Sequence, residues 1–258
     1  MALTRRAFLK TTGMAALSLP LLRIADAGVG EVPVLLYHDI SDHGQGPYTL
    51  PPSLFASQME WLFSEGYRVV PVREIGRLAG AGAGRTVVIT FDDGYASFLD
   101  HAFPVLSYYR FPATINIVAA WTGKFIETEP GRNRPLLSWD EYRFLLGTGL
   151  VDLGCHTFDL HHPGGVPAVP AERLRQDLRR FQETMERETG RTADILAWPY
   201  GIYDRSGMDE AQREGFRCLL TSNEGLFTVG SRLDEVPRLN IGGQADLRSF
   251  RRHFGGVS

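Results

Sequence analysis

Stretches with the pattern of buried β-strands alternate with stretches of helical pattern along most of this chain. The strand-like stretches are short apolar or β-branched runs, and the helix-like stretches carry apolar residues at helical spacing. One helix-like stretch opens with the capping box Ser138-x-x-Glu141. This alternation predicts an α/β fold, with a parallel sheet covered by helices in a single domain. The predicted strands lie at residues 32–37, 86–91, 113–120, 150–155, 195–198, 217–221 and 237–241, and the predicted helices at residues 53–65, 96–109, 138–147, 170–189 and 246–254.

Composition excludes two classes of protein. Of the 258 residues 43% are hydrophobic, a globular value that excludes a mostly disordered chain. The 27 basic and 30 acidic residues give a formal charge of −3. Nucleic-acid-binding proteins usually have an excess of positive charge, so the sequence gives no indication of a nucleic-acid partner. The cysteines, Cys155 and Cys218, are too few for a disulfide framework, and we expect both to be buried free thiols.

The first 27 residues have the features of an export signal. Arg5 and Arg6 precede a Phe-Leu-Lys step, an apolar run covers residues 13–22, and a small-x-small cleavage site ends at Ala27. The segment resembles a bacterial twin-arginine signal, which implies the twin-arginine export machinery as a partner and a mature domain at 28–258. We therefore expect a periplasmic or secreted protein with no stable membrane span after processing. Retention of the signal as an uncleaved anchor is the alternative.

Three polar clusters stand where predicted strands end, which is where parallel α/β folds place their chemistry. The first contains the adjacent acids Asp92 and Asp93, which cannot share one side of a regular strand because successive side chains alternate. At a strand end, with Gly94 free to turn, both can approach one site from different directions. One carboxylate can then bind a cation while the other transfers a proton. An Asp-Asp-Gly turn without function is the alternative.

The second cluster, residues 156–162, holds three of the seven histidines. On a helix, residues five apart lie roughly 140° apart, so only a loop brings His156 and His161 together. Imidazoles with one carboxylate are a usual ligand set for a catalytic zinc that leaves a position open for water. We expect His156 and His161 to bind metal, with His162 as the rival ligand. Asp159 either orients an imidazole or caps the loop.

The third cluster follows the strand predicted to end at Trp198. Pro199 and Gly201 constrain a turn there, and such a turn can direct a backbone N–H, that of Tyr200, toward a developing oxyanion. We expect the rings of Trp198 and Tyr203 to stack on a sugar. Packing of Trp198 against the core is the alternative.

Together the clusters resemble the motifs of the polysaccharide deacetylase family, also called carbohydrate esterase family 4. Residues 90–95 match its Thr-Phe-Asp-Asp-Gly-Tyr signature, the His-Thr step at 156–157 matches its second motif, and residues 198–201 resemble part of the third. The resemblance implies a distorted (β/α) barrel with fewer than eight parallel strands. It also implies a divalent metal, usually zinc, and hydrolysis of N-acetyl groups on an amino-sugar polymer. By the family pattern Asp93 binds the metal and Asp92 is the general base.

The histidine spacing narrows the resemblance. Most family members space the two histidines four apart, a position that Leu160 occupies here. The spacing of five to His161, with the early Leu36-Tyr37-His38, resembles the branch of poly-β-1,6-N-acetylglucosamine N-deacetylases.

Two features depart from the family pattern. Ala197 stands where the third motif normally has an arginine that partners the base, so that partner is missing. No Leu-x-His, the usual source of the general acid, is found near the C-terminus. We expect His38 to replace this acid, and packing of His38 at the barrel rim is the alternative.

These features predict an enzyme, a metal-dependent hydrolase that releases acetate from an extracellular polysaccharide containing N-acetylglucosamine, with the poly-β-1,6 linkage favoured. Asp92 takes the proton of the attacking water, the Tyr200 N–H and the metal stabilise the oxyanion, and His38 protonates the leaving amine. Two alternatives stay open: a peptidoglycan or chitooligosaccharide deacetylase, and a non-catalytic glycan-binding relative. We expect a monomer with one divalent ion, Zn²⁺, whose predicted ligands are Asp93, His156 and His161.

Overall fold

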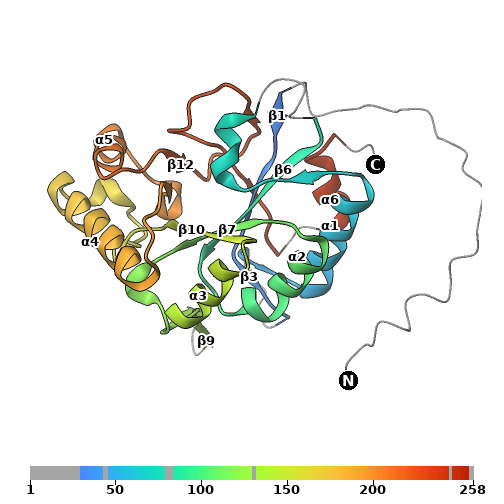
Figure 1. Ribbon diagram of the computed structural model, residues 1–258, viewed down its shortest axis with the longest axis horizontal. Helices are drawn as coiled ribbons and strands as arrows, with labels where there is room; N and C mark the ends of the chain where they lie inside the picture. Colours follow the sequence, from blue (N-terminus) through green and yellow to red (C-terminus); the bar gives the residue numbers. More distant parts are fainter. Residues whose placement is uncertain (1–29, 43–45, 79–83, 130–131, 244–245, 256–258) are drawn as a thin grey trace, which may run out of the picture.

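The computed structural model describes residues 30–42, 46–78, 84–129, 132–243 and 246–255, and a curved parallel β-sheet forms its centre (Figure 1). The barrel path has seven strands in the order β12-β11-β10-β7-β6-β2-β14, and the short β5 pairs with the first residues of β6. All these pairs are parallel, which confirms the predicted distorted α/β barrel. The strands are β2 (Val34–Tyr37), β5 (Arg68–Val69), β6 (Thr86–Asp93), β7 (Ala113–Ile117), β10 (Val151–Cys155), β11 (Ile195–Ala197), β12 (Cys218–Leu220) and β14 (Leu239–Asn240).

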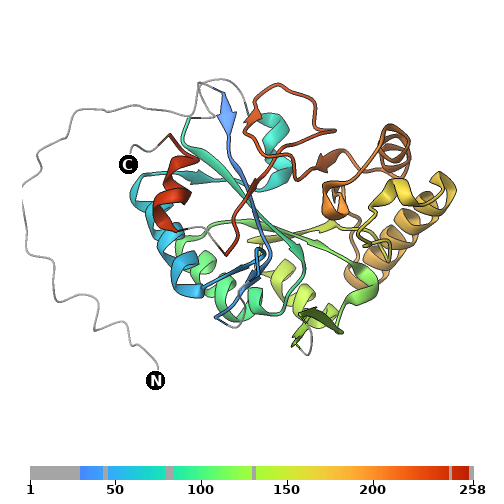
Figure 2. The same cartoon turned by 180° about the vertical axis from the view of Figure 1, so that it is seen from behind.

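Helices cover the outer face of this sheet, as the opposite views in Figures 1 and 2 show. One group packs in the order α6, α1, α2, and a second in the order α3, α4, α5. The α-helices are α1 (Pro52–Ser64), α2 (Phe103–Tyr109), α3 (Trp139–Gly147), α4 (Ala171–Thr189), α5 (Arg205–Arg213) and α6 (Leu247–Arg252). Shorter helical turns are η1 (Val72–Arg77), η3 (Phe98–Ala102), η4 (Ala119–Trp121), η5 (Val166–Ala168) and η6 (Pro199–Gly201).

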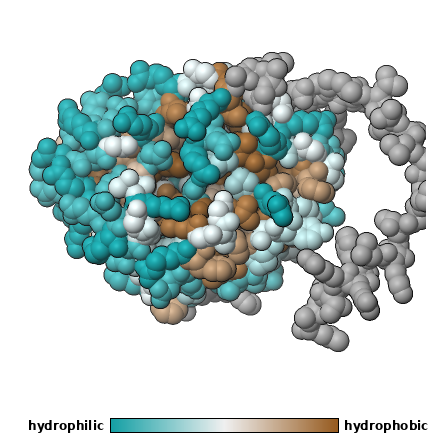
Figure 3. All heavy atoms as spheres, in the orientation of Figure 1, coloured by the Kyte–Doolittle hydropathy of each residue, from teal (hydrophilic) through white to brown (hydrophobic). Residues whose placement is uncertain are grey.

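Most elements begin and end near their predicted positions, for local reasons. The predicted capping box is present: Ser138 accepts a hydrogen bond from the Glu141 N–H, and Glu141 accepts one from the Ser138 N–H. The amphipathic pattern of α4 places its apolar side chains against the core, while its outer face is hydrophilic in Figure 3. The strand predicted at 113–120 is shorter, because the chain leaves the sheet after Ile117 and turns into η4.

Small strand pairs were not predicted, and two of them stand at the C-terminal ends of the barrel strands. β3 (Asp39–Ile40) pairs with β4 (Thr49–Leu50), and β8 (Phe125–Glu129) forms a hairpin with β9 (Arg132–Pro135). A third pair joins β1 (Glu31–Val32) to β13 (Phe227–Thr228). Four of these six strands are two residues long, too short to show the periodicity that identified the barrel strands.

One segment nearly closes the barrel. Val236 bridges Leu220 in β12, and three residues further on β14 begins and pairs with β2, so residues 236–240 link β12 at one edge of the sheet to β2 near the other. The midpoint of this segment is Arg238, which is 1% exposed. Its side chain therefore enters the barrel where the sheet is open.

Alternation along each strand separates the barrel interior from the helix-facing core. On β6, Val87, Ile89 and Phe91 belong to the core between sheet and helices, whereas Val88 belongs to a second apolar cluster inside the barrel. Asp92 continues the inward-facing series at the C-terminal end. The interior is thus apolar at one end and polar at the other, and the polar end holds the site described below.

Three further predictions concern the chain as a whole. Cys155 and Cys218 are buried free thiols, as expected. The export signal predicted at 1–27 lies outside the described residues. No helix in the ranges described above combines the length and apolar character needed to cross a membrane.

Candidate metal and catalytic site

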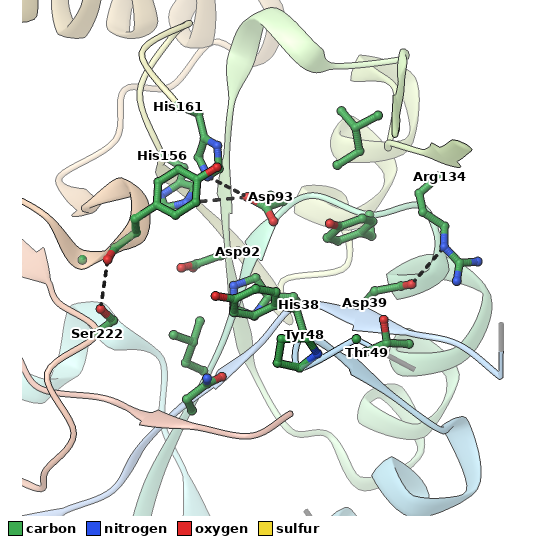
Figure 4. Close-up of a pocket in the computed structure, with 18 of the residues that line it drawn as sticks. His38, Asp39, Tyr48, Thr49, Asp92, Asp93, Arg134, His156, His161 and Ser222 are labelled. Carbon is green, nitrogen blue, oxygen red and sulfur yellow. Dashed lines mark hydrogen bonds and ion pairs between the residues drawn. The ribbon is translucent and has the colours of Figure 1, made fainter. Parts of the chain in front are cut away.

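A cavity of about 630 Å³ opens at the C-terminal ends of the barrel strands (Figure 4). Its lining includes His38, Asp92, Asp93, His156, His161 and Arg238. Trp198 and Tyr200 line it as well, so the three polar clusters predicted from the sequence meet in one place. The β3–β4 and β8–β9 pairs contribute the opposite wall.

The adjacent acids reach this cavity from different directions because the backbone turns at Asp93. Asp92 occupies an inward-facing position of β6, whereas Asp93 has a φ of 70°, and Gly94 follows with a φ of 82°. A Cβ at position 94 would overlap the hydroxyl of Tyr142, so the turn requires glycine. The predicted divergence of the two carboxylates is confirmed, and the left-handed conformation begins at Asp93 itself.

Asp93 and two histidines converge on one point. Asp93 Oδ1 lies 3.6 Å from His156 Nε2 and 3.3 Å from His161 Nε2, and all three side chains point toward one another in Figure 4. One ligand atom from each lies within 4.8 Å of the others. Asp93 Oδ1 is buried and, within the described residues, accepts no regular hydrogen bond. Two imidazole nitrogens and an oxygen left without a donor fit a divalent cation. His162 is outside this group.

A backbone carbonyl orients His156. Its Nδ1 lies 2.8 Å from the carbonyl oxygen of Ala197, so Nδ1–H donates there and Nε2 faces Asp93 with its lone pair. Burial lowers the pKa of His156 to about 4 against the opposing charge of Asp92, so the imidazole is neutral at pH 7. The side chain of Asp159 is exposed, so of its two proposed roles the structure does not support orientation of an imidazole.

The carboxylate of Asp92 is fully engaged with neighbouring donors. Arg238 Nη1 donates to Oδ1 at 2.9 Å and Nη2 donates to Oδ2 at 2.7 Å, a bidentate pair. Asn116 Nδ2 also donates to Oδ1, at 2.7 Å. Arg238 is held in turn by the carbonyl oxygen of Thr221, which accepts from Nε at 2.7 Å.

These contacts keep Asp92 ionised. Burial alone would raise its pKa, but the charge and hydrogen bonds of Arg238, together with His156, lower that pKa below the ordinary carboxyl value. Burial opposes ionisation of Asp93 too, but the neighbouring side chains of His161, His38 and His156 lower its pKa. Both acids are therefore carboxylates at neutral pH.

His38 stands at the end of β2 and lines the cavity beside the exposed ring of Tyr48, whose centroid is 4.8 Å away. Its Nδ1 is buried and has no hydrogen-bond partner within the described residues. Burial lowers the pKa of His38 against the charges of Asp93 and Asp92. The His38 ring therefore lines the cavity, as its predicted role requires. The alternative was a ring that only packs at the barrel rim.

Comparison with known proteins agrees with this geometry. The family model described as polysaccharide deacetylase matches residues 79–219. The chain belongs to the polysaccharide deacetylase family. The match begins before β6 and ends in β12, so it includes Asp92, Asp93 and both histidines.

The chain is only distantly similar to individual members of the family. The chain is 25% identical to the poly-β-1,6-N-acetyl-D-glucosamine N-deacetylase of Escherichia coli (strain K12) over 255 residues, covering 84% of this chain and 38% of that protein. It thus spans well under half the length of that relative. With the enzyme of the same name from Staphylococcus aureus (strain MSSA476), identity is 25% over 81% of this chain and 73% of that one.

Two solved structures resemble the fold closely. The de-N-acetylase from Aggregatibacter actinomycetemcomitans aligns with a TM-score of 0.73 and 26% identity, covering 87% of this chain and all of that one. IcaB from Ammonifex degensii aligns with a TM-score of 0.75 and 25% identity, covering 86% of this chain and 95% of that one.

Arg238 corrects one conclusion drawn from the sequence motifs. Ala197 does occupy the place of the usual arginine, but the partner of Asp92 is present and comes from residues 236–240 instead. Sequence reasoning missed it because Arg238 lies 146 residues after Asp92 and no local pattern marks it. A lone arginine in a predicted strand, at a position that should be buried, was the available signal.

The aromatic residues around the cavity also differ from the prediction. Trp198 is 1% exposed and its ring stacks on Tyr203 at 5.6 Å, within the helix-facing core. Stacking of a sugar on Trp198 is therefore wrong, and Tyr203 does not line the cavity but donates a hydrogen bond to Glu235. The exposed rings in the lining are Tyr48 and Tyr200.

Proposed function

We propose that this chain removes N-acetyl groups from a polysaccharide that contains N-acetylglucosamine, and that the poly-β-1,6-linked polymer is its substrate. The observation that carries the proposal is the pairing of two unlike sites within one cavity. Asp93, His156 and His161 form a set of metal ligands, and next to it stands a carboxylate with its own arginine. The two curated relatives act on the β-1,6 polymer by name, and the five-residue histidine spacing supports the same substrate.

The proposed ligands of the metal are Asp93 and the Nε2 atoms of His156 and His161. A bound divalent cation, which we propose to be Zn²⁺, supplies a Lewis acid that polarises the acetamide carbonyl and lowers the pKa of water to about 7. Asp92 accepts the proton of the attacking water. Its Oδ2 is the atom suited to this, because it accepts one hydrogen bond whereas Oδ1 accepts two.

The remaining roles fall to groups on the cavity wall. The backbone N–H of Tyr200 donates to the oxyanion, and a left-handed φ of 57° at this residue fits a backbone held in a special conformation. His38 passes the proton taken from the attacking water on to the leaving amine, since its lowered pKa favours a neutral ring that can accept this proton and then release it. The exposed rings of Tyr48 and Tyr200 contact the sugar in place of Trp198 and Tyr203.

The location and assembly are proposals of the same kind. The residues of the amino-terminal signal support export through the twin-arginine machinery to the periplasm or beyond. We propose that the exported domain works as a monomer on extracellular polymer.

Acetate release tests the proposed function. The exported domain, loaded with Zn²⁺, is assayed in parallel on poly-β-1,6-N-acetylglucosamine, on chitooligosaccharides and on peptidoglycan. We expect faster release from the β-1,6 polymer. Faster release from either of the other polymers would change the substrate, and binding of polymer without acetate release under any divalent metal would identify a non-catalytic glycan-binding protein. The presence of Arg238 removes one reason to favour that last outcome, the missing arginine.

A further inference from the structure

The loop that carries both histidines is held in an unusual backbone shape. Thr157, directly after His156, has a φ of 75°, a conformation that a β-branched residue rarely adopts. Its hydroxyl accepts a hydrogen bond from the Leu160 N–H, and Leu160 is buried in the core. This shape lets the sixth residue of the loop, His161, turn back toward Asp93. Such a backbone persists only when its surroundings fix it.

Helix α4 supplies a carboxylate that fixes the middle of this loop. Asp177 Oδ1 accepts a hydrogen bond from the N–H of Phe158 at 2.7 Å, and Oδ2 accepts one from the N–H of Asp159 at 2.9 Å. Asp177 is 9% exposed although it lies on a helix with a strongly charged outer face. Each oxygen of a buried acid is thus used on a separate backbone donor of the ligand loop.

Other contacts clamp the same residues. Arg180, three residues after Asp177 on α4, places its guanidinium 4.1 Å from the centre of the Phe158 ring. On the opposite side, the N–H of Ala120 donates to the carbonyl oxygen of Phe158 at 2.9 Å. The neighbouring Trp121 touches the ring of His161, with centroids 4.8 Å apart. The loop therefore lies between α4 and η4, and Asp177 is the one charged group that bonds directly to its backbone within the described residues.

We propose that Asp177 is a positioning residue for the metal site: it holds the loop in the shape that brings His161 to Asp93. This inference rests on the proposed metal-dependent function. His156 needs this help less, because β10 and the Ala197 carbonyl already fix it. Without the Asp177 carboxylate, two partly buried N–H groups lose their acceptors, and the loop relaxes toward water or other partners. His161 then spends less time at the metal, and metal affinity falls.

The test is the dissociation constant for Zn²⁺, measured by competition with a chromogenic chelator, in the wild-type domain and in Asp177→Ala. Loss of a group that orients metal ligands costs about 10- to 100-fold in metal affinity, and we expect a loss of this size. Asp177→Asn retains one acceptor oxygen, so its affinity should lie between those of Asp177→Ala and the wild type. The visible spectrum of the Co²⁺-loaded domain should change in the same order, because it reports the ligand set and not the stability of the fold.

Asp246→Ala is the matched control. Asp246 also accepts a hydrogen bond from a backbone N–H, that of Ser249 at 2.6 Å, but it caps α6 outside the cavity. This variant should lose stability while keeping wild-type metal affinity. Affinities within twofold of wild type in both Asp177 variants would overturn the inference and leave the proposed function standing. If Asp177→Ala does not fold, Asp177→Asn alone decides. A wild-type domain that binds no divalent metal would overturn the proposed function, and this inference with it.

Discussion

Asp92 and Asp93 are neighbours in the sequence and end in opposite surroundings. Asp92 accepts three hydrogen bonds and forms a buried pair with Arg238. Asp93 faces two imidazole nitrogens, and its Oδ1 accepts no regular hydrogen bond within the described residues. Among the described residues, Asp92 therefore has an arginine as its counter-ion, whereas Asp93 has none.

This difference explains why one pair of acids can serve two roles. A buried carboxylate is costly unless a positive charge compensates it. At Asp92 the compensation is permanent, so the group stays ionised and fixed in place. At Asp93 the neighbouring groups are the imidazoles of His156 and His161, a ligand set that fits a divalent cation. Substitutions at Asp92 and Arg238 should therefore have effects different from those at the proposed metal ligands.

Asp92→Asn should have the largest effect, on catalysis alone. Removal of a general base lowers turnover by about 10²- to 10⁴-fold. Metal binding by Asp93, His156 and His161 should be unchanged. The measurements are kcat for acetate release and metal content. Asp140→Asn, at an exposed acid on α3, serves as control and should match wild type. Normal turnover in Asp92→Asn would refute the assigned base.

Arg238→Met should act chiefly on stability. Breaking a buried ion pair leaves Asp92 without its compensating charge and costs about 3–5 kcal/mol in the free energy of unfolding. Denaturant unfolding measures this loss. Arg205→Met breaks an exposed pair with Asp209 and should cost less than about 1 kcal/mol. Equal losses in the two variants would mean that Arg238 carries no special role.

His161→Ala tests the Asp93 side, with His162→Ala as its neighbour control. Loss of a direct ligand should weaken metal binding by at least about 100-fold. That is the largest loss usually seen when a residue that only hydrogen-bonds to a metal ligand is removed. The structure leaves His162 outside the ligand group, so its variant should bind as wild type does. If His162→Ala is the variant that loses metal, the chosen imidazole is wrong.

Tyr48→Ala should give the smallest effect, because it alters neither acid. Loss of one aromatic contact with a sugar is worth roughly 1 kcal/mol, so KM should rise about fivefold with kcat unchanged. Tyr108→Ala removes an exposed ring outside the cavity lining and should leave both constants as they are. A fall in kcat without a change in KM would place Tyr48 in the chemical step.

The barrel strands and the metal ligands could be predicted from the sequence because their signals are local. β6 is a continuous buried run that ends at the two acids, and the histidines lie within one short loop. The rule that parallel strands gather their C-terminal ends brought these pieces together. The fold and the candidate ligand set both follow from such patterns.

What the sequence could not provide depends on contacts between distant segments. Arg238 reaches Asp92 because residues 236–240 connect the edges of the sheet, which no periodicity indicates. Asp177 resembles any acid on a charged helix until its two backbone partners are seen. The sugar-facing rings were misplaced because a terminal Trp198 can point to either side of the sheet, and here it enters the core.

Metal content tests the central claim most directly. The protein, purified, loaded with Zn²⁺ and freed of excess ion, is analysed by mass spectrometry beside Asp93→Asn and Asp92→Asn. We expect one tightly held ion per chain in the wild type and in Asp92→Asn, and a large loss of bound metal in Asp93→Asn. A wild type without metal, or an Asp93→Asn variant that keeps it, would contradict the division of labour between the two acids.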